Sequence, residues 1–190
     1  MSLPTQRDAV GQLRALGWSK YFADQATSAA LSKTPPVRIT QVHRNTLHIQ
    51  GVDLDMIIPG LHGVTVGDWL LFDADAPRNS QLLSRKSLIK RRAPGHDRKE
   101  QLIAANLDTA FVVTSCNNDF SLARLERYVA MAHEAGVTPV IILSKIDLTT
   151  EASDFAAQAQ SISPQLSVVC LDARSPEAIE LLHPWSQAGQ

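Results

Sequence analysis

The sequence predicts two parts of different fold class, a small β-barrel followed by part of a parallel α/β sheet. Between Val37 and Ile58, hydrophobic residues alternate with polar ones at the period of two that is typical of half-buried strands. Beyond Gly95, continuous apolar runs alternate with helical patterns, as in parallel α/β sheets. The chain has 190 residues, of which 44% are hydrophobic, so it is long enough for one ordinary domain or two small ones.

A helical segment over residues 1–34 precedes the barrel. Its hydrophobic positions form a broken helical stripe: Leu13, Leu16, Tyr21 and Phe22. Gly17 and Trp18 interrupt this stripe, and the pair Pro35-Pro36 ends any helix.

Residues 35–93 are expected to form the barrel. The predicted strands contain Val37 and Ile39, then Leu47 and Ile49, then Val52 to Ile58, then Trp69 to Phe72, and last Gln81 to Ile89. Glycines at positions 60, 63 and 67 separate the third strand from the fourth. Five short strands at this spacing favour an oligonucleotide-binding (OB-fold) barrel.

Residues 94–190 are expected to form the α/β part. Its strands are predicted at Thr109–Thr114, Pro139–Leu143 and Leu166–Leu171, and its helices at Ser121–Ala135, at 151–160 and from Pro176 onward. Strands that are apolar on both faces and alternate with helices form parallel sheets. Three strands are too few for a finished domain of this kind, so the sequence predicts a partial domain.

Polar residues follow the second and third of these strands. Ser144, Lys145 and Asp147 come after the second, and Asp172, Ala173 and Arg174 come after the third. Ligands of open α/β sheets bind beyond the carboxyl ends of the strands. Ser-Lys-x-Asp resembles the Asn-Lys-x-Asp motif with which GTPases select guanine, although Asp147 would equally serve as the cap of the next helix.

The chemistry of guanine explains these residue types. A carboxylate accepts hydrogen bonds from the two adjacent donors of guanine, its ring N–H and its exocyclic amine. The stem of Lys145 is suited to cover the flat base. The backbone N–H of Ala173 is expected to donate to the guanine carbonyl oxygen.

The phosphate-binding half of a GTPase has no counterpart in these residues. The sequence contains no Gly-x-x-x-x-Gly-Lys-[Ser/Thr] loop, and none of its 9 glycines is followed by lysine. In the usual GTPase order this loop precedes the guanine motif, whereas here a barrel precedes it. We therefore expect the loop to be lost or to follow in a permuted order, and we assign no catalytic residue.

A cluster of basic residues connects the two parts. Seven of the 18 lysines and arginines lie between residues 85 and 99: Arg85, Lys86, Lys90, Arg91, Arg92, Arg98 and Lys99. In a chain of net charge −1 this local excess predicts a surface for nucleic-acid phosphates. A solvated linker would have the same composition.

Other functions find little support in the sequence. The two cysteines, Cys116 and Cys170, end apolar runs and are expected to be buried thiols. The histidines show no metal-ligand spacing, so no metal site is predicted. The absence of a signal pattern or a long apolar run predicts a cytoplasmic protein that does not enter a membrane, and we expect a monomer.

The chain resembles the ribosome-small-subunit-dependent GTPase A family (RsgA, also called YjeQ or EngC). The resemblance rests on several stretches that together cover nearly the whole chain: Val66-Gly67-Asp68-Trp69, Arg85-Lys86-Ser87, Arg91 to Gly95, Glu100 to Asp108, Asn118-Asp119-Phe120, Arg124 to Tyr128, the loop of Lys145 and Asp147, and Pro184-Trp185.

The resemblance implies an OB-fold barrel, a circularly permuted GTPase domain and a C-terminal zinc domain. It implies that the chain is the front part of a longer protein, cut before the phosphate loop, and that zinc belongs only to the missing domain. The full-length protein would bind GTP or GDP with Mg²⁺, hydrolyse GTP when the ribosome stimulates it, and bind rRNA in maturation of the small (30S) ribosomal subunit. The 190-residue chain alone is expected to be inactive.

Two departures from the family accompany this resemblance. Ser144 stands where the family usually has asparagine, and Asp172 and Arg174 replace a more usual serine and lysine around Ala173. Two other functions stay open: a non-enzymatic RNA-binding module whose α/β part is a scaffold, and an unrelated α/β enzyme that binds another nucleotide or a small acid.

Overall fold

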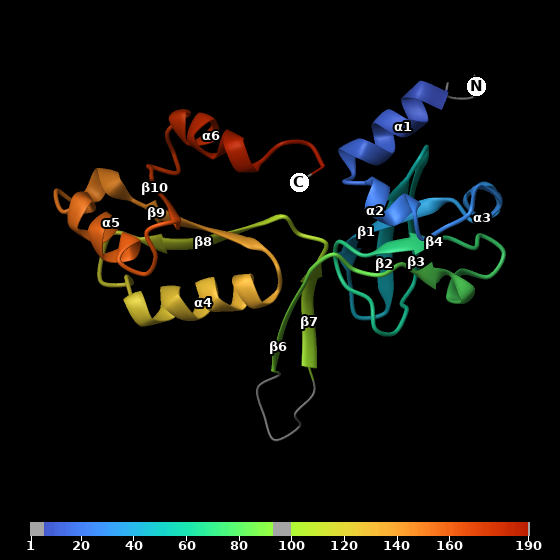
Figure 1. Ribbon diagram of the computed structural model, residues 1–190, viewed down its shortest axis with the longest axis horizontal. Coiled ribbons are helices and arrows are strands. Elements are labelled where there is room, and N and C mark those ends of the chain that lie inside the picture. The colour runs from blue at the N-terminus through green and yellow to red at the C-terminus, as the bar shows by residue number, and fades with distance from the viewer. Residues whose placement is uncertain (1–5, 93–99, 190) are drawn as a thin grey trace. The chain divides into compact units, whose positions relative to one another are not determined.

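The structure is a computed structural model that describes residues 6–92 and 100–189 (Figure 1). The chain divides into two compact units, one of residues 1–107 with 188–190 and one of residues 108–187. The sequence placed the boundary earlier, after residue 93. The difference arises because the segment after it forms a strand that pairs back within the first unit.

The first unit contains a five-stranded sheet with the order β3-β2-β1-β4-β5. Its strands are β1 (Pro36–Val42), β2 (Thr46–Gly51), β3 (Leu54–Pro59), β4 (Trp69–Leu71) and β5 (Gln81–Leu82), and each pairs with its neighbours in antiparallel fashion. Alternate residues such as Val37, Ile39, Leu47 and Ile49 form the buried core of this sheet. The first four strands were predicted, but among the described residues no ladder joins the edges β3 and β5, so closure into a barrel is not shown.

The predicted fifth strand, Gln81–Ile89, is wrong as one element. Only β5 pairs with β4, and the chain then leaves this sheet before β6 (Leu88–Arg92) begins. Strand β6 forms a separate antiparallel hairpin with β7 (Glu100–Ala105). The break has a physical reason, because the Arg85 side chain turns inward to Asp68 and the Lys86 N–H donates to Asn106 instead of to a sheet neighbour.

The helical segment before the sheet is present, as predicted. It consists of α1 (Gln6–Ala15), α2 (Lys20–Ala23) and α3 (Ser28–Lys33), and Gly17 turns the chain after α1 with a φ of 88°. Trp69 of β4 is fully buried beside Phe22, and the ring of Trp18 meets it edge-on with centroids 4.7 Å apart. These aromatic contacts fix the helices on the face of β4 opposite the sheet core. The short helix η1 (Pro77–Asn79) lies between β4 and β5.

The second unit is a three-stranded parallel sheet with the order β10-β9-β8. The chain runs through β8 (Thr109–Ser115), α4 (Leu122–Glu134), β9 (Thr138–Ser144), η2 (Ile146–Leu148), α5 (Ala152–Gln160), β10 (Ser167–Cys170), α6 (Glu177–Leu182) and η3 (His183–Trp185). Figure 1 shows this alternation of strands and helices. The predicted parallel sheet is confirmed.

Helices cover the two faces of this sheet unequally. Helices α4 and α5 pack against one face through a cluster that includes Leu125, Ile141 and Ala159. On the other face, Ala178 of α6 packs against Val140 and Ile142 of β9. The edge strand β8 stays open there, because Phe111 and Val113 are 40% and 64% exposed.

The two cysteines lie in the second unit as free thiols. Cys116 is buried and Cys170 is half-buried. Burial raises the pKa of both thiols, which favours their protonated form. Within the described residues, no helix has the length and apolar character that a membrane span requires.

Candidate functional site

The carboxyl ends of β9 and β10 lie side by side in the second unit. Leu143 pairs with Cys170 in the parallel register, and the Leu171 N–H donates to the Leu143 oxygen at 2.9 Å. The loops that follow these two strands therefore start from neighbouring points of one sheet edge. This edge is where open α/β sheets bind ligands.

The loop after β9 has a defined backbone shape. The Ser144 hydroxyl donates to the Thr114 oxygen of β8 at 2.9 Å, and the Cys116 N–H donates to the Ser144 oxygen at 3.0 Å. Lys145 has a φ of 61°, in the left-handed region that non-glycine residues rarely adopt. This turn starts η2, so that the loop carries Asp147 on a short helical turn and leaves Lys145 exposed.

Asp147 meets the loop that follows β10. Its Oδ2 accepts from Nη2 of Arg174 at 2.5 Å, and the Asp147 side chain is 25% exposed. Asp172 holds Arg174 from the other side, since its Oδ1 accepts from the Arg174 backbone N–H at 3.0 Å and from Nε at 3.3 Å. These hydrogen bonds from Arg174 lower the pKa of the Asp172 carboxyl below its ordinary value.

The predicted guanine-site residues thus gather at one place. Asp147, Asp172 and Arg174 form a continuous polar chain, and Ser144 and Lys145 belong to the same loop as Asp147. Ala173 is exposed, and its backbone N–H has no hydrogen-bond partner among the residues that the structure describes. A carboxylate and a free N–H on neighbouring loops are the acceptor and donor that recognition of a purine edge needs.

A cavity of about 430 Å³ lies where β8 and β9 end. It is lined by Val113, Thr114, Ser115, Asp119, Arg124, Tyr128 and Ser144. Thr114 Oγ1 is buried and finds no hydrogen-bond partner within the described part of the chain. A buried hydroxyl without a hydrogen-bond partner lowers the stability of the fold, so this cavity is suited to a further polar group that would pair with Thr114 Oγ1.

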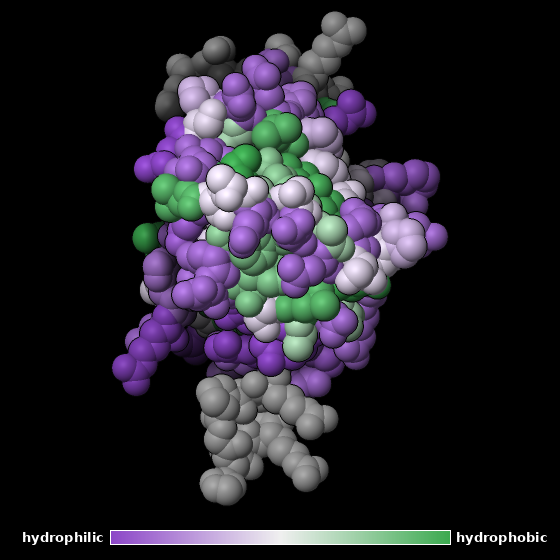
Figure 2. All heavy atoms as spheres, turned by 90° about the vertical axis from the view of Figure 1, so that its left-hand side faces the viewer, coloured by the Kyte–Doolittle hydropathy of each residue, from purple (hydrophilic) through white to green (hydrophobic). Residues whose placement is uncertain are grey.

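The surface of this unit is also partly apolar. Figure 2 shows a face on which hydrophobic residues gather toward the middle and hydrophilic residues surround them. Among the described large hydrophobic residues, Leu148 next to Asp147 is 71% exposed and Ile179 of α6 is 75% exposed. Such side chains offer contact area to further protein.

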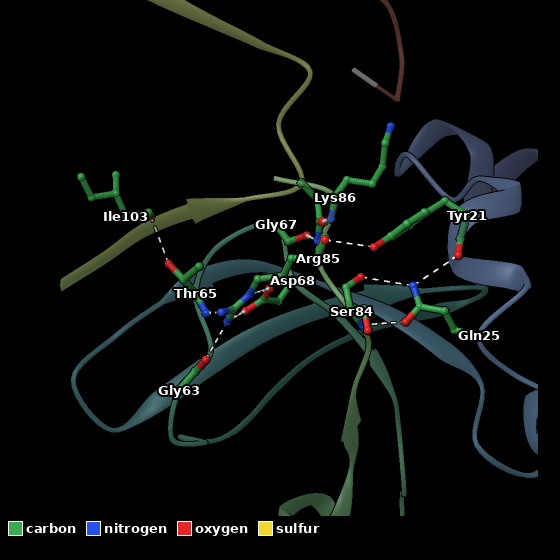
Figure 3. Close-up of polar contacts among 11 residues, drawn as sticks. Tyr21, Gln25, Gly63, Thr65, Gly67, Asp68, Ser84, Arg85, Lys86 and Ile103 are labelled. Carbon is green, nitrogen blue, oxygen red and sulfur yellow. Dashed lines mark hydrogen bonds and ion pairs between the residues drawn. The ribbon is translucent and has the colours of Figure 1, made fainter. Parts of the chain in front are cut away.

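The predicted RNA-binding residues belong to the first unit, and Arg85 among them has an interior role. Its Nε and Nη2 donate to the two oxygens of Asp68, both at 2.7 Å, and Nη2 also donates to the Gly63 oxygen at 2.6 Å (Figure 3). The Asp68 side chain has no exposed surface and also accepts from the Thr65 N–H at 2.8 Å. This carboxylate raises the pKa of Arg85, whose charge it neutralises. Contact of Arg85 with RNA stays a prediction.

Asn106 anchors the start of the β6–β7 hairpin beside this ion pair. Its Oδ1 accepts from the Lys86 N–H at 2.8 Å and its Nδ2 donates to the Gly67 oxygen at 2.9 Å. Asn106 itself has a φ of 57°, which asparagine tolerates better than most residues. Gly67 is required here, because a Cβ at that position would collide with the carbonyl group of Ala105.

The remaining basic residues lie on or near the hairpin. Lys90 pairs with Glu100 at 2.8 Å, and Arg91 Nε donates to Gln101 at 3.0 Å. Both pairs join β6 to β7 across the hairpin. Arg92 ends β6, while Arg98 and Lys99 lie outside the described residues. The described residues contain no group of three histidines, cysteines or carboxylates that could hold a metal ion.

The sequence reading missed the interior roles of Asp68 and Asn106. Both are buried polar residues, at 0% and 7% exposure. A signal for Asp68 was available, since a carboxylate between Gly67 and Trp69 interrupts an otherwise apolar run at the start of a strand. A carboxylate in that position requires a buried partner.

Comparison with known proteins identifies the family. The family model described as RsgA GTPase matches residues 82–189, which is more than half of the chain. The chain belongs to the RsgA GTPase family. Relatives include a protein from Mesorhizobium japonicum named small ribosomal subunit biogenesis GTPase RsgA, which is 43% identical over 183 residues. Another, from Vibrio parahaemolyticus and named small ribosomal subunit biogenesis GTPase RsgA 2, is 37% identical over 182 residues.

The chain spans about half the length of these family members. The matches cover 94% of the chain but 52% of the Mesorhizobium protein and 50% of the Vibrio protein. Among solved structures, YjeQ from Thermotoga maritima aligns with a TM-score of 0.58 over 79% of the chain and 56% of that structure. At 18% identity this alignment supports the fold alone.

Proposed function

We propose that the full-length protein binds and hydrolyses GTP during maturation of the small ribosomal subunit, and that this chain supplies its guanine-recognition part. The observation that supports this proposal best is the meeting of the loops after β9 and β10. There the Asp147 carboxylate and the Ala173 N–H, which is unpaired among the described residues, belong to neighbouring turns. The names of the curated relatives agree with the proposed role.

In the proposed site the base lies between these two loops. Asp147 accepts hydrogen bonds from the ring N–H and the exocyclic amine of guanine, and the Ala173 N–H donates to the guanine carbonyl oxygen. Lys145 covers the base with its aliphatic stem. Adenine presents a ring acceptor where guanine presents its ring N–H, so it would leave the carboxylate without that donor.

The phosphates and Mg²⁺ require residues outside this chain. No Gly-x-x-x-x-Gly-Lys-[Ser/Thr] loop occurs in it, so we propose that another segment of the longer protein supplies this loop. The open edge and exposed face of β8, with the unsatisfied Thr114 hydroxyl at its end, are suited to receive that segment. The 190-residue chain alone would then show no GTP turnover, and zinc would belong to a further domain.

The first unit is proposed to bind rRNA. An OB-fold barrel offers the surface between its strands and loops to nucleic acid, and the hairpin adds Lys90 and Arg91. Contacts of lysine and arginine with phosphates dominate such binding and make it salt-sensitive. We propose that contact of this unit with the small ribosomal subunit stimulates GTP hydrolysis by the full-length protein, and that this takes place in the cytoplasm.

The proposal is tested by comparing GDP with inosine diphosphate on the full-length protein. Inosine lacks the exocyclic amine, so one of the hydrogen bonds to Asp147 is missing and we expect binding to weaken by about tenfold or more. Competition against a fluorescent GDP measures this difference. The matched control is 7-deaza-GDP, which keeps both donors and should bind as GDP does. Equal affinities for GDP and inosine diphosphate would contradict the base contact.

A further inference from the structure

Arg174 forms an ion pair with Asp147, the carboxylate that the proposed function assigns to guanine. Its Nη2 lies 2.5 Å from Oδ2 of Asp147, although the two residues come from loops after different strands. The side chain crosses the space between those loops, and Asp172 holds it at Nε and at its own backbone N–H. Arg174 therefore bridges the two loops between which the base is proposed to bind.

The guanidinium group has the donor pattern of guanine. The edge of guanine that faces a carboxylate consists of a ring N–H and an amine on one shared carbon, which is itself a guanidine unit. Arginine presents the same planar fork of N–H donors, and this fork matches a carboxylate with two parallel hydrogen bonds. In the structure one donor of this fork, Nη2, reaches Oδ2 of Asp147, while Nε donates to Asp172, so Arg174 takes up one of the two oxygens that suit the base.

We propose that Arg174 is an internal substitute for guanine, which holds Asp147 in the nucleotide-free protein and leaves it when the base binds. This inference rests on the proposed function. Only the fraction of molecules with Arg174 displaced is competent to bind, so the apparent affinity for guanine nucleotides is reduced by that fraction. Arg174 thus sets how fast guanine nucleotides enter the site.

The contact is weak enough to be displaced. The Arg174 side chain is 75% exposed, and ion pairs with exposed partners shift an equilibrium by at most about fivefold. The neighbouring carboxylates, first Asp172 and then Asp147, raise the pKa of Arg174 above its ordinary value. Arginine is charged at every physiological pH in any surroundings, so that competition by the base, and not deprotonation, displaces it.

The test is the binding kinetics of fluorescent GDP on the full-length protein and its Arg174→Ala variant, followed by stopped flow. We expect the association rate to rise about two- to fivefold in the variant and the dissociation rate to stay the same, because Arg174 acts before the base enters. Arg174→Lys keeps the charge but loses the guanidinium that donates to Asp172 and Asp147 together, so its association rate should approach that of the alanine variant. Arg127→Ala removes an equal charge from α4, where Arg127 lies over the Tyr128 ring, and should behave as the unaltered protein.

Two results would overturn the inference. An unchanged association rate in Arg174→Ala would mean that Arg174 does not compete with the base, and a faster dissociation rate would mean that it holds the bound nucleotide instead. Asp147→Asn separates this inference from the proposed function. If Asp147→Asn weakens GDP binding while Arg174→Ala changes nothing, only the inference on Arg174 fails. If neither substitution changes GDP binding, both the inference and the proposed guanine contact fail.

Discussion

Asp68 and Asp147 are carboxylates with opposite surroundings. Asp68 is buried and accepts hydrogen bonds from the Thr65 N–H and from two nitrogens of Arg85, so its acceptor positions are largely used. Asp147 has a quarter of its side chain exposed and accepts from Arg174 alone among the described residues. A carboxylate has about four acceptor positions. Asp147 therefore has capacity left for a ligand, while Asp68 serves the fold.

Removing the buried carboxylate should destabilise the first unit. In Asp68→Ala the Arg85 guanidinium loses its partner inside the protein, which costs about 3–5 kcal/mol of unfolding free energy. Urea unfolding of the 190-residue chain measures this loss, followed by tryptophan fluorescence in a variant with Trp185→Phe, which leaves only the tryptophans of the first unit, Trp18 and Trp69.

The matched control breaks an exposed ion pair of the same unit. Lys90 and Glu100 are 48% and 59% exposed, so Lys90→Ala should change the unfolding free energy by no more than about 1 kcal/mol. If Asp68→Ala is unfolded in buffer, the double variant Asp68→Leu with Arg85→Met removes both charges and should recover folding. A change as small for Asp68→Ala as for Lys90→Ala would show that the ion pair is not structural.

At the scale of elements, the hairpin of β6 and β7 is anchored at one end and carries basic residues on β6 away from that end. Asn106 and Gly67 fix the end next to the five-stranded sheet, and Val66 forms a bridge with Ala104. Lys90 and Arg91 lie further along β6. The anchoring holds these cations on a paired element and not on a free linker.

Neutralising the hairpin should weaken RNA binding in a salt-dependent way. For the double variant Lys90→Gln with Arg91→Gln, we expect lower affinity of the full-length protein for small ribosomal subunits. The slope of log K against log salt should fall by about one for each phosphate that the variant no longer neutralises. Binding titrations at several salt concentrations measure both quantities.

The control for this prediction is Lys33→Gln, which removes an exposed cation from α3 of the same unit. It should leave both the affinity and the slope unchanged. Equal effects of Lys33→Gln and of the hairpin variant would mean that net charge, and not the hairpin, determines RNA binding.

At the scale of the whole molecule, the hydrophobic pattern predicted the elements that are buried by apolar contacts alone. Pro139–Leu143 is apolar at every position and lies within the central strand β9. From the rule that ligands bind at the carboxyl ends of strands, the sequence predicted that Asp147 and Arg174 lie close together, and in the structure they form an ion pair. The family resemblance, which rested on separated stretches such as Val66-Gly67-Asp68-Trp69, is confirmed by the family match.

The features that the sequence did not predict have a common physical cause: polar contacts between residues far apart in the chain leave little trace in the hydrophobic pattern. The break after Leu82 depends on Arg85 reaching Asp68. The position of Asp68 indicates a buried carboxylate, but the sequence does not indicate which cation pairs with it. Strand β7 reads as the mixed run Glu100 to Ala105 and pairs with β6 across a segment that contains Pro94 and Gly95. The Arg174–Asp147 contact depends on a long side chain, whose direction the sequence does not encode locally.

The most direct test of the guanine assignment exchanges the acceptor of Asp147 for a donor. Asp147→Asn in the full-length protein presents an amide, which matches the ring carbonyl that xanthine has in place of the guanine amine. The measurement is the affinity of this variant for GDP and for xanthosine diphosphate, by competition against a fluorescent nucleotide. The account predicts weaker binding of GDP and a preference for xanthosine diphosphate. Unchanged GDP affinity, with no gain for xanthosine diphosphate, would contradict it.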